Sequence, residues 1–452
     1  MRLRKTITTI VATAILLAGW QLFAVIANQP ELIPSLPRLV RTLCEWLVSG
    51  SFYQSVGATI LRGILGMSIS FVCAIGMAGL FARFEWVYEL FRPLLAIMRS
   101  IPVISFILLA LIFLNPESIP LMIAFLTMFP LLTENLTRGI LDLRPGLSIM
   151  ARQFHIKCSN VLFQIIYPQL KPFLYSGLAS AAGFGWRAII MGEVLSQCAF
   201  GIGSEMKRAQ NFIAVPELLA WTIVAVFISF FFDKGISKVA DITPKISFAN
   251  EDQTIPTPTL SVLDTKDISY QYGIQHFSHS FQKGIIYGIS APSGKGKTTL
   301  LNLIGGILLP TEGEIHPTRH FGIATIFQQP QLLPHLTAEE NIILPLSSFL
   351  TEEKARRIAQ KHLQEMEMEP FGNRYPKELS YGQQQRIAIA RALAYPSPLL
   401  LMDEPFKGLD EALSHRIIER IREKQMKEER IILFTSHNPD EIRLLADEVI
   451  YL

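Results

Sequence analysis

Apolar residues are distributed differently in the two halves of the chain. Before residue 240 they form long runs, several of which could cross a bilayer core of about 30 Å as a helix. After residue 260 the apolar runs are short and are separated by polar or helix-period segments, which is typical of buried parallel strands alternating with helices. The pattern predicts two domains: an all-α membrane domain and, after it, an α/β domain.

Six spans are predicted in the first half. They lie near Thr6–Ala27, Ile64–Ala82, Leu94–Leu114, Ile119–Leu132, Leu174–Leu195 and Leu218–Phe232. The first run is longer than the core of a usual signal peptide, so an uncleaved anchor is favoured over a cleaved signal. An even number of spans places both ends of this domain on one side. The basic N-terminal cluster and the loop Glu134–Pro172 favour the cytoplasm for that side.

Composition supports the division into a membrane body and a cytosolic body. Of the 452 residues, 50% are hydrophobic and only 17% are charged, whereas about a quarter is charged in soluble proteins. Charges are sparse before Asp233 and dense after Thr351. The net charge of +3 is too small to indicate nucleic acid as a partner. The four cysteines are scattered, which excludes a disulfide framework and a cysteine metal site: Cys44, Cys73, Cys158 and Cys198.

Two charges fall inside a predicted span, in the stretch GFGWRAIIMGEVL. Arg187 and Glu193 are costly in a membrane and are therefore candidates for function. A structural pair, or a glutamate at the membrane edge, explains them equally well. Pro102, Pro120 and Pro130 can interrupt helices that face a cavity, and kinked packing explains these prolines just as well.

A polar, proline-containing stretch separates the two halves. It runs from Ile242 to Leu260 and predicts an extended linker. The expected domains are therefore residues 1–240, a linker at 241–260, and residues 261–452. Within the first half, the loop that begins at Ile149 predicts a short amphipathic helix, near Ile149–Val161, on the cytoplasmic face. Such a helix could dock onto the second domain.

A phosphate-binding loop opens the second domain. An apolar run, Gly284–Ser290, predicts a strand, and the sequence TTLLNLIGGIL after the loop can start a helix. The loop and the first residues of this helix are the candidate phosphate-binding residues: Ala291, Pro292, Ser293, Gly294, Lys295, Gly296, Lys297, Thr298 and Thr299. Glycine N–H groups would surround a β-phosphate, Lys297 would bridge the outer phosphates, and the Thr298 hydroxyl would bind Mg²⁺. Ala291 replaces the usual first glycine, and it is tolerated if its φ is negative.

Two carboxylates follow a second apolar run, LLLMDEP at Leu399–Pro405. A buried parallel strand delivers its C-terminal end to the nucleotide site. Asp403 suits Mg²⁺ held through water, and Glu404 suits polarisation of the attacking water. A buried strand with an acidic turn is a common alternative, but the phosphate loop in the same domain argues against it.

The segment KELSYGQQQRIAIARALAY, Lys377–Tyr395, resembles the signature of ATP-binding-cassette proteins. Its core has Ser380, Gly382 and Gln383 in the family positions, and Ser380 can cap the following helix and create an anion site. Tyr381 departs from the family pattern, where glycine is usual. The resemblance covers Ser261–Leu452 and implies a P-loop ATPase fold of that family.

The same resemblance assigns roles to further residues. It implies that Gln328 senses Mg²⁺ and meets the membrane partner, that Asp410 lies in a dimer-contact loop, and that His437 contacts the γ-phosphate. Tyr272 resembles the aromatic residue that stacks on adenine, with Tyr270 as the alternative. In this family ATP lies between the phosphate loop of one cassette and the signature of another, which implies a homodimer.

The membrane half resembles, more weakly, the permeases of bacterial nitrate, sulfonate, taurine and thiamine-precursor importers. The matching stretches are LIPSLPRLVRTL, MRSIPVISFILL, GWRAIIMGEVL and the docking segment before IIYP. The docking motif normally begins Glu-Ala-Ala and has a glycine further on. In this chain the first three positions look like Ile149, Met150 and Ala151, and the glycine position looks like His155. The resemblance implies a multi-pass protein of the bacterial inner membrane with a cytoplasmic ATPase domain.

The function implied is ATP-driven import of a small-molecule cargo, with ATP and Mg²⁺ as cofactors. The partners implied are a second copy of the chain, membrane lipids, and a periplasmic or lipid-anchored binding protein that carries most of the selectivity. An exporter is disfavoured because its helices normally run far into the cytoplasm. An ATPase-linked membrane sensor with weak hydrolysis stays open, because Ala291 and Tyr381 would suit it. A soluble kinase-like enzyme is excluded by the membrane half.

Overall fold

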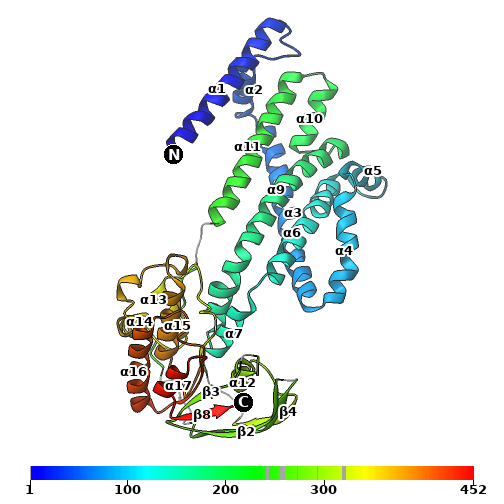
Figure 1. Cartoon of the computed structure of the whole chain (residues 1–452). Helices are drawn as coiled ribbons and strands as arrows, with labels where there is room; N and C mark the ends of the chain where they lie inside the picture. Colours follow the sequence, from blue (N-terminus) through cyan, green and yellow to red (C-terminus); the bar gives the residue numbers. More distant parts are fainter. Residues whose placement is uncertain (1, 241–243, 254–259, 272, 293, 318–321) are drawn as a thin grey trace. The chain divides into compact units, whose positions relative to one another are not determined.

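The structure is a computed structural model, and it describes residues 2–240, 244–253, 260–271, 273–292, 294–317 and 322–452 (Figure 1). The chain divides into two compact units. The first comprises Met1–Leu143 and Gln169–Thr243, and the second comprises Arg144–Pro168 and Pro244–Leu452. The segment from Arg144 to Pro168, which includes the expected docking helix, therefore belongs to the second unit. The domain boundaries predicted from composition stay a prediction, since compactness alone does not define functional domains.

The first unit is helical, which confirms the expected all-α class (Figure 1). Its elements are α1 (Arg2–Ala27), α2 (Leu36–Trp46), α3 (Gly50–Arg83), α4 (Glu85–Ser100), α5 (Val103–Phe113), η1 (Pro116–Ser118), α6 (Ile119–Leu141), α9 (Tyr167–Ser196), α10 (Ile202–Asn211) and α11 (Val215–Ala240). By length and composition, four described stretches could cross a membrane, and the bent pair α4 and α5 could supply a fifth. The helix α1 adds a shorter apolar stretch, Ala14–Ala27.

The prediction of one continuous span over Leu94–Leu114 is wrong. The structure divides it between α4 and α5, whose axes differ by 94°. Pro102 explains the break because proline has no N–H to donate and disfavours the helical conformation in the residue before it. Ile101 accordingly adopts an extended conformation, with φ −70° and ψ 130°.

Small residues bring α3 and α6 close together. A stripe of small side chains along α3 is buried: Ser55, Thr59, Gly63, Gly66, Ser70, Ala74 and Ala78. A Cβ atom added at Gly66 would lie only 2.7 Å from the Cβ of Ala124 on α6. Close helix contact through small residues is the usual way in which helices associate in a membrane, where apolar side chains gain little from leaving lipid.

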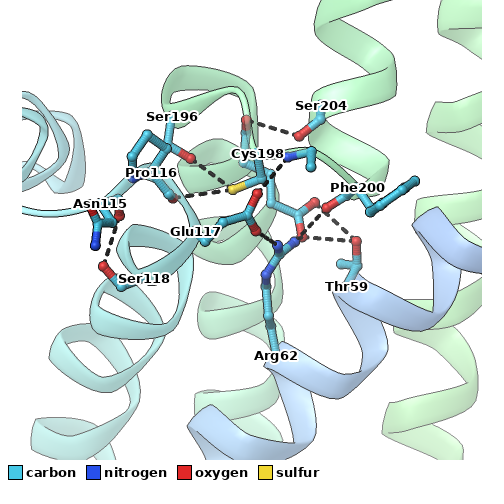
Figure 2. Close-up of polar contacts among 12 residues, drawn as sticks. Thr59, Arg62, Asn115, Pro116, Glu117, Ser118, Ser196, Cys198, Phe200 and Ser204 are labelled. Atoms are coloured by element: carbon cyan, nitrogen blue, oxygen red, sulfur yellow. Dashed lines mark hydrogen bonds and ion pairs between the residues drawn. The ribbon is translucent and has the colours of Figure 1, made fainter.

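A buried polar cluster joins four elements of this unit (Figure 2). Glu193 on α9 is fully buried, and its carboxylate accepts hydrogen bonds from Arg62 at 2.7 Å, Thr59 at 2.9 Å and the Gly203 N–H at 2.9 Å. Arg62 also donates to Glu117 of η1, at 2.6 Å (Figure 2). Glu193 is thus paired, but its partner is Arg62 of α3 and not the nearby Arg187.

The second unit contains two sheets. Five parallel strands lie in the order β5 (Ala324–Ile326), β6 (Leu399–Asp403), β7 (Ile431–Thr435), β3 (Ile286–Ser290) and β8 (Glu448–Tyr451). Three antiparallel strands lie in the order β2 (Ile274–Gln282), β1 (Val262–Tyr270) and β4 (Glu312–His316). The helices are α7 (Pro145–Gln153), α8 (Cys158–Asn160), η2 (Val161–Ile166), α12 (Lys297–Ile304), α13 (Ala338–Leu346), α14 (Glu352–Glu365), η3 (Glu369–Phe371), η4 (Pro376–Glu378), α15 (Tyr381–Ala394), α16 (Glu411–Glu428) and α17 (Pro439–Leu445).

Both faces of the parallel sheet are buried. Along β6, Leu400 and Met402 face one hydrophobic cluster, and Leu399 and Leu401 face the other. This alternation explains why the strand reads as an unbroken apolar run in the sequence. The strands are parallel, so the carboxyl ends of β3, β6 and β7 meet at one edge of the sheet, where the phosphate loop and the two carboxylates begin.

The predicted docking helix is shorter than expected. The helix α7 ends at Gln153, and not near Val161, because His155 adopts a left-handed conformation with φ 46°. The N–H of Ile156 donates to the Ala151 carbonyl, and the N–H of His155 donates to the Arg152 carbonyl. This pairing ends a helix in a Schellman motif. His155 holds the place that the importers give to glycine, the residue best suited to a positive φ.

The described part of the expected linker lies along the second unit. The Ala249 N–H donates to the Ser347 carbonyl at 3.0 Å, and the Gln253 N–H donates to the Phe349 carbonyl at 2.8 Å. Asn160 of α8 bonds both the N–H and the C=O of Ser247, each at 2.8 Å. This part of the expected linker has no regular secondary structure, and it is hydrogen-bonded to α8 and to the end of α13.

Candidate functional site

The phosphate loop lies between β3 and α12, in the strand–loop–helix context that the sequence predicted. Gly294 and Gly296 have positive φ values of 81° and 90°. A Cβ atom at Gly296 would lie 2.8 Å from the Gly273 carbonyl oxygen, so glycine is required there for space as well as for φ. Ala291 is not among the residues with positive φ in the described part of the chain, so its methyl group causes no backbone strain. Ser293 lies outside the described residues.

Lys297 is positioned at the first turn of α12. Its side chain is buried, and its Nζ donates to the Ala291 carbonyl at 2.7 Å. The ammonium group thus reaches across the loop to the backbone of Ala291, with which it forms one hydrogen bond. Phosphate oxygens are stronger acceptors than a neutral carbonyl for a charged donor, so a bound polyphosphate could replace this contact.

Asp403 and Thr298 form the second part of the site. The Thr298 hydroxyl donates to one Asp403 carboxylate oxygen at 2.9 Å, and the Thr435 hydroxyl donates to the other at 2.8 Å. Burial raises the pKa of Asp403, and the two hydroxyl donors partly oppose this shift. A hydroxyl and a carboxylate side by side are hard oxygen ligands of the type that Mg²⁺ prefers, so Thr298 and Asp403 fit that ion.

Glu404 faces three polar side chains that come from three different loops. Its carboxylate is 3.2 Å from Gln328 Nε2, 3.2 Å from His437 Nε2 and 3.0 Å from Lys407 Nζ. Burial raises the pKa of Glu404, but the Lys407 ammonium and the Gln328 amide outweigh burial, and the net shift is downward. The carboxylate is therefore ionised and can accept a proton or orient a water molecule.

The signature segment begins α15. The Ser380 hydroxyl accepts from the Gln383 N–H at 3.3 Å, and the Gln383 side chain accepts from the Ser380 N–H at 2.9 Å, so the two form a capping box. Asp410 caps α16 in a similar way, because it accepts from the Leu413 N–H at 2.9 Å. Gly382 leaves room for the neighbouring loop, since a Cβ atom there would lie 2.6 Å from the Gly408 carbonyl oxygen.

Tyr381 reaches out of the signature segment to two loops of its own cassette. Its hydroxyl donates to the Gln328 carbonyl at 2.8 Å. Its ring lies against Gly408, where an added Cβ atom would be only 2.8 Å from a ring carbon. The aromatic side chain therefore fills a space between the loops that carry Gln328 and Asp410, and it leaves the backbone N–H groups at the start of α15 in place.

The segment Arg144–Pro168 packs into the hydrophobic core of the second unit. Phe154 is fully buried, and its ring lies 5.1 Å from the ring of Tyr395 and 5.4 Å from the Arg391 guanidinium carbon. Gln153 donates to the Gly305 carbonyl at 2.8 Å. Ile149 and Gln328 line one cavity, so the expected proximity of this segment to the Gln328 loop is present.

Several residues that complete the site were not identified from the sequence. Thr435 holds Asp403 and also accepts from the Glu404 N–H at 3.1 Å. Lys407 pairs with Glu404. Arg391 donates to the Gln331 and Pro330 carbonyls at 2.8 and 2.9 Å and so supports the loop after Gln328. The only local signal was the position of Thr435, directly after an apolar run. Tyr272, the expected adenine contact, lies outside the described residues.

The described structure thus brings together the P-loop lysine, the two carboxylates, Gln328 and His437 at one edge of a parallel sheet. Residues 274–407 match the family model of the ABC transporter, and residues 56–233 match that of the binding-protein-dependent transport system inner membrane component. The two matches do not overlap and fall in the two halves of the chain.

Individual relatives agree with the family models. The Fe(3+) ions import ATP-binding protein FbpC of Rhizobium etli is 35% identical over 189 residues, which are 40% of this chain and 54% of the relative. The chain thus spans about half the length of this relative. The thiamine import ATP-binding protein ThiQ of Yersinia pseudotuberculosis is 34% identical, over 42% of this chain and 86% of the relative.

An uncharacterized ABC transporter ATP-binding protein of Methanocaldococcus jannaschii, MJ0796, is 34% identical, over 40% of this chain and 85% of the relative. Its cassette, solved as a dimer in a post-hydrolysis state with ADP and Pi, is 32% identical with a TM-score of 0.40 and covers 42% of this chain and 94% of that chain. The sequence matches alone decide the family. The chain belongs to the ABC transporter family and carries a binding-protein-dependent permease domain and an ABC ATPase domain in one polypeptide.

Proposed function

We propose that this protein uses ATP hydrolysis to import a small solute across the bacterial cytoplasmic membrane. The observation that carries the proposal is the combination, in one chain, of a permease domain of the binding-protein-dependent class with an ABC ATPase domain. The relatives that are named for import, those for iron and thiamine, support the direction of transport. A separate binding protein on the outer side would deliver the cargo.

In the nucleotide site, the N–H groups around Gly294 and Gly296 and the Lys297 ammonium would bind the phosphates of ATP. Thr298 and Asp403 would hold Mg²⁺, together with Gln328 when that side chain leaves Glu404. The ion would neutralise charge on the phosphates during transfer. Glu404 would orient and deprotonate the attacking water, and His437 would contact the γ-phosphate. The backbone of Ala291–Thr299 would line the phosphates, and Tyr272 would stack on adenine.

A homodimer is part of the proposal. Ser380 and Gln383 cap their own helix, and Tyr381 bonds the Gln328 loop, so the described bonds of the signature do not lead to the phosphate loop of the same cassette. A second cassette would then supply Ser380, Gly382 and Gln383 to the γ-phosphate, with Asp410 at the dimer contact. Two equivalent composite sites follow from two-fold symmetry.

The decisive experiment is uptake in vesicles made from cells that express the full chain together with its cognate binding protein. We expect accumulation of the cargo against its gradient, dependent on ATP on the cassette side. Cargo efflux from the cell would support an exporter. Hydrolysis without movement of any solute, even with the cognate binding protein present, would support a membrane regulator instead.

Replacement of Lys297 by alanine should weaken ATP binding itself. The lysine is the buried cation of the loop, and a hydrogen bond to a charged group contributes about 1.5–3 kcal/mol. The dissociation constant for ATP should therefore rise about 10- to 150-fold. Fluorescent nucleotide binding to the purified protein measures it. The matched control is Lys295→Ala, whose exposed side chain lies in the same loop and whose removal should change the affinity little.

Replacement of Tyr381 should change hydrolysis only modestly. Tyr381→Phe removes one hydrogen bond to Gln328, which contributes about 0.5–1.5 kcal/mol, so turnover should stay within about tenfold. Tyr381→Gly restores the usual family residue and should also stay near this range, because the helix-start N–H groups are unchanged. A rise of several hundred-fold, about 3–4 kcal/mol of barrier, would instead mean that the native site is nearly inactive.

A further inference from the structure

A cavity at the carboxyl edge of the parallel sheet gathers three polar side chains around one carboxylate. It has a volume of about 500 Å³, and its lining includes Gln328, Glu404, Lys407 and His437. The Glu404 carboxylate lies 3.2 Å from Gln328 Nε2, 3.2 Å from His437 Nε2 and 3.0 Å from Lys407 Nζ. Gln328 and His437 have a place at the nucleotide in the proposed function, whereas Lys407 has been given none.

The backbone at Lys407 is held in place by its own loop. The Lys407 N–H donates to the Glu404 carbonyl at 3.2 Å. The next residue, Gly408, has a φ of 79°, and a Cβ atom added there would lie 2.8 Å from a ring carbon of Tyr381. Because the turn and the tyrosine ring fix the loop, a change in the position of the ammonium group needs only side-chain rotation.

Lys407 reaches Glu404 from the solvent side of the cavity. Its side chain is 51% exposed, whereas that of Glu404 is 15% exposed. Water competes for an exposed ammonium group, so an ion pair of this kind is weak and the lysine can exchange its acceptor. Anionic phosphate oxygens are strong acceptors for a charged donor, so a phosphate beside Glu404 would attract the Lys407 ammonium.

We infer that Lys407 is a further catalytic residue, a second cation that binds the γ-phosphate of ATP in addition to Lys297. Carboxylate and phosphate oxygens are both anionic acceptors, so a donor that is held on Glu404 is suited to a phosphate beside it. The ammonium would also offset the repulsion between the γ-phosphate and the Glu404 carboxylate as charge develops during transfer. This inference rests on the proposed function, in which the phosphate loop and Glu404 surround the γ-phosphate.

The alternative is that Lys407 stays on Glu404 and restrains hydrolysis. The ammonium would then compete with water for the carboxylate, and its removal should speed turnover. A half-exposed lysine is poorly suited to such a restraint, because water weakens the pair. The two hypotheses predict changes of opposite sign in turnover.

The test compares two nucleotides that differ in the γ-phosphate. The purified full chain is titrated, in the presence of Mg²⁺, with ADP and with adenosine 5′-(β,γ-imido)triphosphate. In Lys407→Met the dissociation constant of the triphosphate analogue should rise by about tenfold, the lower end for loss of a hydrogen bond to a charged group. The dissociation constant of ADP should stay near that of the parent chain. Lys407→Arg keeps the charge and should retain most of the preference for the triphosphate.

Lys283→Met is the matched control. The Lys283 ammonium pairs with Glu429 at 2.8 Å and is 40% exposed, but Lys283 precedes β3 and so lies at the opposite edge of the sheet from the phosphate loop. Its replacement should change neither dissociation constant. Turnover of ATP is measured on the same preparations, and it should fall in Lys407→Met and be largely restored in Lys407→Arg.

Three results would overturn the inference. Equal weakening of both nucleotides in Lys407→Met would mean that the lysine only supports the loop. Unchanged affinity for both would mean that it does not contact the nucleotide, and faster turnover would mean that it restrains Glu404. None of these measurements needs transport. Loss of uptake with the Lys407-dependent preference intact would contradict import alone, and uptake without that preference would contradict the γ-phosphate contact alone.

Discussion

Glu404→Gln should abolish steady-state ATP hydrolysis while ATP binding is retained. Glutamine keeps the size and the hydrogen-bonding oxygen of the side chain but cannot take a proton from water. General-base catalysis contributes typically 10²–10⁴-fold, and turnover should fall by about that factor. The Glu404 carboxylate lies 3.0 Å from Lys407 Nζ and 3.2 Å from His437 Nε2, so the substitution also removes the ion pair with Lys407.

The measurement is phosphate release by the purified full chain, with nucleotide affinity determined on the same preparation. Since ATP would remain bound between the cassettes, the variant should also accumulate as a closed dimer that gel filtration or crosslinking detects. Glu441→Gln is the matched control: Glu441 lines the same cavity as Glu404, but its carboxylate bonds Ser436. It should retain most of the hydrolysis. Substantial turnover by Glu404→Gln would mean that another group activates the water.

The parts of the site that the sequence predicted are those fixed by local chain geometry. A glycine loop after a strand and two carboxylates after another strand both lie at strand ends, and parallel strands bring their carboxyl ends to one edge. Asp403 and Thr298 therefore meet at 2.9 Å although they are 105 residues apart. To predict this arrangement it is enough to locate the strands. Strands whose two faces are both buried appear in the sequence as short apolar runs.

The parts that the sequence did not predict depend on contacts between distant elements. Nothing near Glu193 indicates that its partner is Arg62, 131 residues earlier, because pairing across helices depends on which small residues bring the helices together. From the sequence, Tyr381 is only a departure from the family pattern, because its bond to the Gln328 carbonyl depends on how the two loops are placed. The end of α7 was missed because a histidine, and not glycine, adopts the left-handed conformation at position 155.

A substitution in the docking segment is the second change for which we expect a large effect. It should uncouple hydrolysis from transport. Phe154 is fully buried against Tyr395 and Arg391, and α7 is further held by the Gln153 bond to the Gly305 carbonyl at the end of α12. Phe154 thus anchors the segment that leads into α9 to α15, and the neighbouring Gln153 joins it to the end of α12, the helix that starts at the phosphate loop. An aspartate at this position would meet the Arg391 guanidinium and could form a new ion pair. Phe154→Ala cannot form this ion pair and is therefore the better test of the contact.

Phe154→Ala should lose transport while ATP binding is intact and hydrolysis no longer responds to cargo. Truncating a buried phenylalanine costs about 3–5 kcal/mol, enough to release the segment from its groove without removing any nucleotide contact. Uptake and hydrolysis are measured on the same vesicles, and a thiol crosslink between Ile149→Cys and Gln328→Cys, which line one cavity, reports docking. The crosslink should form in the parent chain and be lost in Phe154→Ala.

Phe349→Ala is the control, because Phe349 packs on the same Tyr395 from outside the segment. Its ratio of transport to hydrolysis should be unchanged. Normal transport by Phe154→Ala, with the crosslink intact, would show that the permease is driven through a different contact.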